Sequence, residues 1–341
     1  MSHLMISSDS HVIEPHDLWI ERLPSKHKDQ APKYPARTNF EKHDGGKDPT
    51  KRVTEMAKDG VSSEVLYASL GLTQFGFTDV DLQEACFRVY NDWLIEYCSH
   101  ARDRLFGIGL ISCYNIDRAV VEVERCKRAG MRGVMVWQVP PEELAFSTKH
   151  YERLWSACGD MQMPVSLHIL TGTPYGLNRE IGTELAPRLT AAVNKKLFYT
   201  CESLMQIIAS GALERHPKLK LVLVETEISW LPYALSQWDK YLNKGNRSTG
   251  ALKLLPSEYF KRQVYATFFN DSPANMIFSQ WGGVDNFMWS NDFPHGNSTW
   301  PNSREVVARD VANLPDSSKE KLLWKNCAQL YDLPVLEPVG A

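Results

Sequence analysis

The chain has 341 residues, of which 43% are hydrophobic and 23% are charged, and its formal net charge is −3. This nearly balanced charge gives no electrostatic reason to expect nucleic acid or an anionic membrane as a partner. No apolar stretch approaches the roughly 20 residues of a membrane-spanning helix, so we expect no membrane insertion. The seven cysteines form no CxxC pair and no signal peptide opens the sequence, which favours reduced thiols in a cytoplasmic protein.

Short apolar runs alternate with longer amphipathic segments along the chain. The apolar runs are mostly continuous, which is typical of strands in a parallel sheet that is buried on both faces. The predicted strands are 5–11, 63–70, 105–112, 133–139, 164–170, 219–226, 264–270 and 287–292. Segments with 3.6-residue apolar spacing are predicted to be helices. These helices are 82–101, 117–129, 151–161, 202–215, 230–242, 303–313 and 317–330.

Polar residues follow strands that are far apart in the sequence. Their positions distinguish between an open sheet and a closed barrel. A doubly wound open sheet would spread these residues along an edge, whereas a (β/α)8 barrel brings all strand ends to one mouth. No G-x-G-x-x-G phosphate loop follows the first strand. We therefore expect residues 1–341 to form one α/β domain, a TIM barrel. Its loop insertions are expected at about 24–50, 172–198 and 244–256, the last two over the mouth.

Two imidazoles and two carboxylates are predicted at this mouth. Asp9 and His11 end the first strand two residues apart, so their side chains point the same way. His168 ends the fifth strand, where burying an imidazole is costly unless it is hydrogen-bonded or bound to a metal. Asp292 ends the eighth strand, where an aspartate often caps the next helix. Each residue alone has a structural explanation, but together they suit a divalent ion such as Zn, Mn, Fe or Co.

Five segments together resemble the amidohydrolase-related family. The most specific are SDSHVIEPHDLW (8–19) and WSNDFPHGNSTWPNSRE (289–305). The supporting segments are GMRGVMV (130–136), ERHPKLKLVLVE (214–225) and WLPYALSQWD (230–239). The resemblance runs nearly end to end. It is to the branch of the amidohydrolase superfamily that contains aminocarboxymuconate-semialdehyde, γ-resorcylate and 5-carboxyvanillate decarboxylases.

The resemblance implies a barrel of the metal-dependent hydrolase type with one catalytic divalent ion. It also implies the ligands, which by their positions in the motifs are Asp9, His11, His168 and Asp292. Zinc is the first expectation, with manganese or iron as alternatives, and no organic cofactor is expected. The resemblance further suggests a homodimer or a larger homo-oligomer.

The sequence departs from the family pattern in two places. The first ligand is Asp9, where the family has His or Glu. Glu225 ends strand six, where the decarboxylases usually have a catalytic His. Glu225 could act as a general base, contact the substrate or bridge to a second ion; alternatively, it pairs with Arg215 or His216. Strand four ends near Trp137 without a lysine, so the carbamylated-lysine bridge of dinuclear relatives is absent.

Further candidates surround the expected mouth. His295 either orients Asp292 or is a loop residue, and Glu14 could brace the mouth. Arg179, or Lys195 or Lys196, could hold a substrate carboxylate. The candidate substrate contacts are Trp137, Phe269, Asn270, Trp300 and Arg179.

Two reactions use nearly the same predicted residues. In hydrolysis, Asp292 or Glu225 would take a proton from metal-bound water that attacks a carbonyl, ester or C–C bond substrate. In non-oxidative decarboxylation, Asp292 would protonate a ring carbon as CO2 leaves. We expect one of these on a small aromatic or ring-derived carboxyl or carbonyl compound. A remote alternative is a barrel that binds ligands without catalysis.

Overall fold

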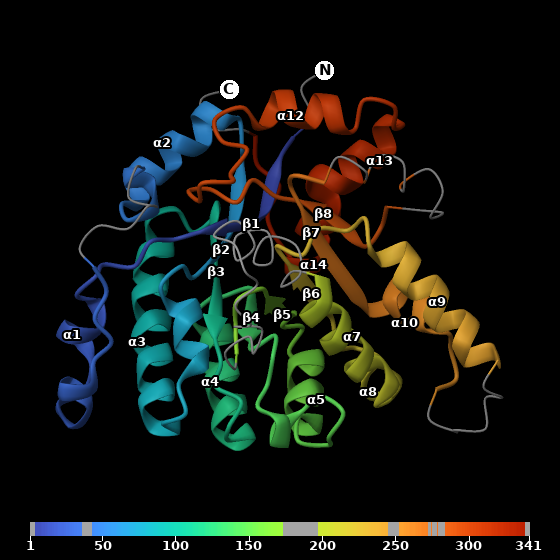
Figure 1. Cartoon of the computed structure of the whole chain (residues 1–341). Helices are drawn as coiled ribbons and strands as arrows, with labels where there is room; N and C mark the ends of the chain where they lie inside the picture. The colour runs from blue at the N-terminus through green and yellow to red at the C-terminus, as the bar shows by residue number, and fades with distance from the viewer. Residues whose placement is uncertain are drawn as a thin grey trace, which may run out of the picture.

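The computed structural model describes residues 4–35, 43–172, 197–244, 252–271, 274, 278 and 284–337. Eight parallel strands are neighbours in chain order and form the central barrel (Figure 1). All eight were predicted from the sequence, with ends up to three residues longer. The strands are β1 (Ile6–His11), β2 (Ser63–Tyr67), β3 (Leu105–Leu110), β4 (Gly133–Val136), β5 (Val165–His168), β6 (Leu221–Val224), β7 (Val264–Phe268) and β8 (Phe287–Trp289).

The barrel is closed by contacts between β1 and the segment that includes β8. The hydroxyl group of Ser8 donates to the carbonyl of Trp289 at 2.8 Å. Beyond the end of β8, the backbone N–H of Asp292 donates to the carbonyl of Asp9 at 3.1 Å. The N–H of His11 donates to the carbonyl of Phe293 at 2.7 Å. The closure therefore joins the two strand ends that carry three of the predicted metal ligands.

Helices surround the barrel in Figure 1, as a (β/α)8 fold requires. They are α1 (Leu18–Arg22), α2 (Pro49–Asp59), α3 (Val80–Cys98), α4 (Ile116–Arg128), α5 (Glu152–Asp160), α7 (Thr200–Ala209), α8 (Ala212–Arg215), α9 (Leu231–Lys244), α10 (Pro256–Gln263), α12 (Ser303–Asp310), α13 (Asp316–Glu320) and α14 (Asn326–Tyr331). Short 3-10 helices are Ser25–Gln30, Asp44–Gly46, Gly71–Gly76, Ser99–Ala101 and Glu142–Leu144. A π-helical segment, Lys321–Lys325, joins α13 to α14.

Helix α2 begins where the first predicted insertion, 24–50, ends. Asp48 caps it by accepting hydrogen bonds from the N–H groups of Thr50 and Lys51. Pro49 stands in the first turn, where its missing N–H costs nothing. Gly60 ends the helix with a φ of 73°, a left-handed conformation that glycine adopts without strain. The described part of 24–50 is therefore partly helical.

The N-terminal end of the barrel is filled by side chains from the interior and from α14. The hydroxyl group of Tyr67 lies 2.9 Å from that of Ser166 and 3.2 Å from that of Tyr331. A Cβ atom on Gly133, the first residue of β4, would lie 3.2 Å from the Tyr331 ring. This end is thus packed, which leaves the opposite end for chemistry.

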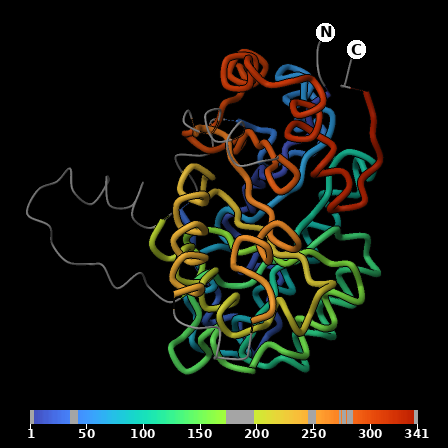
Figure 2. Tube along the Cα trace, turned by 90° about the vertical axis from the view of Figure 1, so that its right-hand side faces the viewer, coloured from blue at the N-terminus to red at the C-terminus, as the bar shows by residue number. Residues whose placement is uncertain are grey.

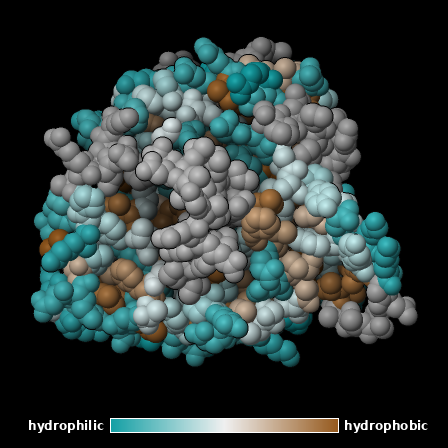
Figure 3. Space-filling model, viewed as in Figure 1, coloured by the Kyte–Doolittle hydropathy of each residue, from teal (hydrophilic) through white to brown (hydrophobic). Residues whose placement is uncertain are grey.

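The described parts of the N-terminal and C-terminal segments lie toward the same end of the molecule (Figure 2). The Arg104 guanidinium group donates to the carbonyl groups of Ser62 and Glu337, each at 2.9 Å, and so links the C-terminal stretch to the barrel. The face in Figure 3 is mostly hydrophilic, with apolar side chains in small separate patches. Among the described residues, the helices are too short or too polar to cross a lipid bilayer.

Candidate metal centre

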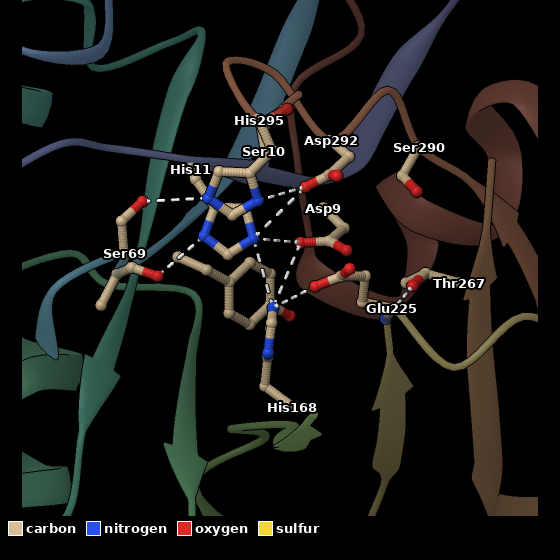
Figure 4. Close-up of polar contacts among 12 residues, drawn as sticks. Asp9, Ser10, His11, Ser69, His168, Glu225, Thr267, Ser290, Asp292 and His295 are labelled. Carbon is tan, nitrogen blue, oxygen red and sulfur yellow. Dashed lines mark hydrogen bonds and ion pairs between the residues drawn. The ribbon is translucent and has the colours of Figure 1, made fainter. Parts of the chain in front are cut away.

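The predicted ligands meet at the C-terminal mouth of the barrel. Asp9 and His11 lie at the end of β1, His168 is the last residue of β5, and Asp292 lies three residues beyond β8. Glu225 directly follows β6. Figure 4 shows their side chains pointing toward one another from these elements. All five residues are buried. The structure therefore brings these five residues together at one mouth (Figure 4).

Three of the candidate ligands are spaced as a single metal ion would require, and Asp292 lies close to one of them. The Nε2 atoms of His11 and His168 are 3.2 Å apart. His11 Nε2 lies 3.5 Å from Asp9 Oδ1 and 3.6 Å from Asp292 Oδ1. His168 Nε2 lies 3.9 Å from Asp9 Oδ1. Bonds of about 2.1 Å to a common ion put ligand atoms about 3–4 Å apart. Asp9, His11 and His168 thus form one group of ligand atoms that fits a divalent cation, and Asp292 lies beside it in a second group that shares His11.

Both histidines present the same ring nitrogen to the centre. His11 Nδ1 lies 2.7 Å from the carbonyl of Ala68, and His168 Nδ1 lies 2.8 Å from that of Ile169. Because a carbonyl oxygen only accepts, each Nδ1 carries the hydrogen, and each Nε2 keeps its lone pair. Burial holds the pKa of His11 well below its ordinary value, and His295 and His168 lower it further. A neutral imidazole is the form that binds metals.

Glu225 lies beside these ligands. Its Oε2 atom is 3.7 Å from His168 Nε2, and its backbone N–H donates to the Thr267 hydroxyl group at 2.9 Å. Glu225 lies with His11, Asp292 and His295 in a second group of ligand atoms within 4.8 Å of one another. This position fits a general base, a substrate contact or a further metal ligand.

The alternative pairing of Glu225 with Arg215 or His216 is wrong. Arg215 Nη2 lies 2.5 Å from Glu152 Oε1, and His216 Nε2 lies 3.0 Å from Glu152 Oε2. Both side chains start from or just beyond α8, before β6, whereas Glu225 follows the other end of that strand. Sequence proximity misled because a strand carries its two ends to opposite ends of the barrel.

Two of the site carboxylates stand on left-handed backbone. Glu225 has a φ of 60° and Asp292 a φ of 55°. Non-glycine residues adopt this conformation at a cost of about 1–3 kcal/mol, and such strain concentrates at functional sites. In both cases the turn at the strand end directs the carboxylate toward the histidines (Figure 4).

His295 and Ser69 extend the site. His295 Nδ1 lies 2.9 Å from Asp292 Oδ1, and its Nε2 lies 3.2 Å from the Ser69 hydroxyl oxygen. Its ring stacks on that of His11, with the centroids 3.9 Å apart. Of the two sequence-based readings of His295, contact with Asp292 is the one that the geometry supports. Ser69 was missed, because a serine after a strand carries no distinctive signal.

The predicted substrate contacts are dispersed. Trp137 is fully buried, donates to the Tyr151 hydroxyl group at 2.9 Å and packs edge-on against Tyr114. Phe269 is buried and Asn270, two residues beyond β7, is exposed. Arg179 lies outside the described residues, as do Lys195 and Lys196.

Trp300 shares a cavity with a site residue. Its indole N–H donates to the carbonyl of Glu55 at 3.0 Å. Together with His43, Phe293 and His295 it lines a cavity of about 190 Å³. A larger groove of about 700 Å³ lies between α3 and α4, and none of the metal-centre residues lines it.

A family model described as amidohydrolase matches residues 9–333, which is nearly the whole chain. This chain belongs to the amidohydrolase family. The γ-resorcylate decarboxylase of Rhizobium radiobacter is 22% identical to it over 256 residues, which cover 68% of this chain and 74% of that protein. The resemblance inferred from the motifs is thereby confirmed.

Solved structures show the same fold. A 5-carboxyvanillate decarboxylase from Sphingomonas paucimobilis superimposes with a TM-score of 0.77 at 20% identity, over 98% of this amidohydrolase chain and 100% of its own. A dihydroxybenzoic acid decarboxylase from Polaromonas sp. JS666, solved with manganese and the inhibitor 2-nitroresorcinol, gives 0.73 at 18% identity, over 99% and 100%. The predicted (β/α)8 architecture is confirmed.

Proposed function

We propose that this amidohydrolase binds one divalent metal ion through Asp9, His11, His168 and Asp292. The observation that carries the proposal is the convergence of two Nε2 atoms and two carboxylates at one barrel mouth, where His11 Nε2 lies 3.2–3.6 Å from a ligand atom of each of the other three residues. Two nitrogens and two oxygens suit manganese, zinc or iron. Manganese in the Polaromonas relative supports manganese, whereas the sequence alone put zinc first.

We further propose that the enzyme removes the carboxyl group of a small aromatic acid without oxidation. The support is the group of relatives, which are decarboxylases of resorcylate, carboxyvanillate and dihydroxybenzoate. When bound, the metal would act as a Lewis acid toward the carboxylate and a neighbouring hydroxyl group of the substrate. The chain then needs to supply only orientation, exclusion of water and one proton.

Asp292 is the proposed proton donor. Its protonated carboxyl group gives the proton to the ring carbon that bears the carboxylate, the bond to that carboxylate breaks, and CO2 leaves. Asp292 is left as a carboxylate and regains a proton from solvent before the next turnover. The His295 Nδ1 atom at 2.9 Å holds the orientation of Asp292, and the buried surroundings of the site exclude bulk water.

A metal-dependent C–C bond, ester or thioester hydrolase is the second candidate. Glu225 favours it, because a carboxylate 3.7 Å from His168 Nε2 is placed to take a proton from an attacking water molecule. Glu225 could also help to hold a second ion, since it shares a group of close ligand atoms with His11 and Asp292.

Substrate assays decide between the two reactions. The enzyme purified without chelator would be incubated with hydroxybenzoates and with ester and ring-cleavage substrates, while CO2 and acid are measured separately. Decarboxylation predicts CO2 and the phenol in equal amounts. Acid production without CO2 would establish the hydrolase instead, and no turnover in a metal-replete protein would favour the binding barrel.

The expectations of one domain, a homo-oligomer and a cytoplasmic location remain proposals. A single cooperative unfolding transition would support the single domain. Light scattering at two protein concentrations would measure the oligomeric state, and a monomer at both would refute the dimer.

A further inference from the structure

A buried carboxylate outside the proposed ligand set holds the loop after β2. Glu14, three residues beyond β1, is 1% exposed. It accepts hydrogen bonds from three successive backbone N–H groups, those of Ser69 at 3.2 Å, Leu70 at 2.9 Å and Gly71 at 2.9 Å. Both carboxylate oxygens take part. One side chain therefore satisfies three adjacent buried or half-buried donors and fixes the path of this loop.

The same loop contacts two histidines of the metal centre. The carbonyl of Ala68 accepts the Nδ1 hydrogen of His11 at 2.7 Å, and the Ser69 hydroxyl oxygen lies 3.2 Å from His295 Nε2. Ala68 directly precedes the three residues whose N–H groups donate to Glu14, and Ser69 is the first of those three. A shift of the loop would therefore rotate the His11 ring and change the contact that places His295 beside Asp292.

The loop is built closely around the carboxylate. A Cβ atom on Gly71 would lie 3.1 Å from Glu14 Oε1, 3.1 Å from the Ala68 side chain and 3.0 Å from Leu110. This spacing leaves no room for a larger residue without displacing a neighbour. Glutamate also suits the three donors better than glutamine, because a carboxylate only accepts whereas an amide presents its own N–H groups.

We infer that Glu14 is a positioning residue that sets the orientation of His11 and His295 through the loop 68–71. This inference rests on the proposed metal site. Contacts that orient a ligating histidine typically change metal affinity by about 10–100-fold when they are removed. Glu14→Gln should therefore weaken manganese binding by about that factor while the barrel remains folded.

The experiment measures manganese affinity by calorimetry and backbone amide exchange by mass spectrometry in the full chain. The variants are Glu14→Gln and Gly71→Ala, which disturb the carboxylate and the loop independently. Both should speed amide exchange in residues 69–71 and weaken manganese binding. Gly71→Ala keeps the inference testable if Glu14→Gln does not fold.

Asn326→Ala is the matched control. Asn326 is also a buried polar side chain that holds backbone, donating to the carbonyls of Val284 at 2.7 Å and Phe287 at 2.8 Å at the start of β8. It should lower the unfolding midpoint without changing manganese affinity. Wild-type affinity in both Glu14→Gln and Gly71→Ala would overturn the inference, as would an equal loss in Asn326→Ala. A wild-type chain that binds neither manganese nor zinc would overturn the proposed metal site itself and the inference with it.

Discussion

His295 lies with its Nδ1 atom 2.9 Å from Asp292 Oδ1, three residues away along the chain. This contact fixes a carboxylate that the proposed reaction uses twice, as a metal ligand and as the proton donor. The ring of His295 also stacks on His11, so its position depends on both carboxylate and imidazole. The pair therefore connects metal binding to proton transfer.

His295→Ala should lower turnover more than it lowers metal content. Loss of the contact removes one restraint on the orientation of the Asp292 carboxyl group, while the four proposed ligands remain, so kcat should fall about 10–100-fold. The rate of CO2 release and the number of metal ions per chain would be measured on the same preparation. Ser69→Ala, which removes the contact to the other ring nitrogen, should show a smaller fall. Unchanged kcat in His295→Ala would rule out a role for His295 in the reaction.

Glu225→Gln distinguishes the two proposed reactions. If Glu225 is the base of a hydrolase, the amide cannot take the proton, and kcat should fall by about 10²–10⁴-fold with metal retained. Glu227→Gln, two residues along the same turn, is the control for general damage to this segment. Full activity of Glu225→Gln in CO2 release would exclude Glu225 as a required base and favour decarboxylation through Asp292.

Arg52, on α2, should be important for stability because it contacts both β2 and the ligand-bearing end of β1. Its fully buried guanidinium group contacts Glu64 at 2.5 Å and donates to the carbonyl of His11 at 2.6 Å. Arg52→Met leaves a buried carboxyl group without its partner and should lower the free energy of unfolding by about 3–5 kcal/mol. Urea unfolding measures this change. The double variant Arg52→Met/Glu64→Leu should recover part of the loss, and a further loss would contradict the proposed cause.

Glu152, the first residue of α5, should make stability depend on pH. Hydrogen bonds from Arg215, with further contributions from His216, lower the pKa of Glu152 from 4.5 to about 2. Because the folded pKa is depressed, the stabilisation is present above about pH 4.5 and is lost as the pH falls toward 2. Glu152→Gln should therefore lower the urea midpoint at pH 7, and its difference from wild type should shrink at pH 3. An equal difference at both pH values would argue against this ion pair.

The barrel could be predicted because its strands are continuous apolar runs, and all eight appear in the structure. The predicted strands extend beyond the observed ends, because apolar residues continue into the turns. Leu170, for example, has a φ of 66° and cannot continue β5. Helix α2 was missed because its buried side chains are Arg52, Met56 and Asp59, of which only Met56 is apolar, so the helix lacks the apolar spacing used to predict the others. Its cap Asp48 and the turn at Gly60 were the signals that could have identified it.

The convergence of the candidate metal ligands could also be predicted, because parallel strands bring their carboxyl ends together. The contacts that orient its residues could not. The backbone carbonyl of Ala68 accepts a hydrogen bond from His11. The Glu14 carboxylate accepts hydrogen bonds from backbone N–H groups about 55 residues further along the chain. Backbone partners leave no pattern in residue types. The pairing of Arg215 and His216 with Glu152 could not be predicted either, because it joins the end of α8 to a different helix, α5.

The most direct test is the metal content of protein purified without chelator, compared between the wild type and His168→Ala. His168 contributes Nε2 at 3.2 Å from that of His11, so its removal should open the site without disturbing the fold. We expect about one manganese, zinc or iron ion per wild-type chain and a folded His168→Ala variant that has lost it. Less than about 0.1 ion per wild-type chain that added metal does not restore, or normal metal content in His168→Ala, would contradict the proposed centre.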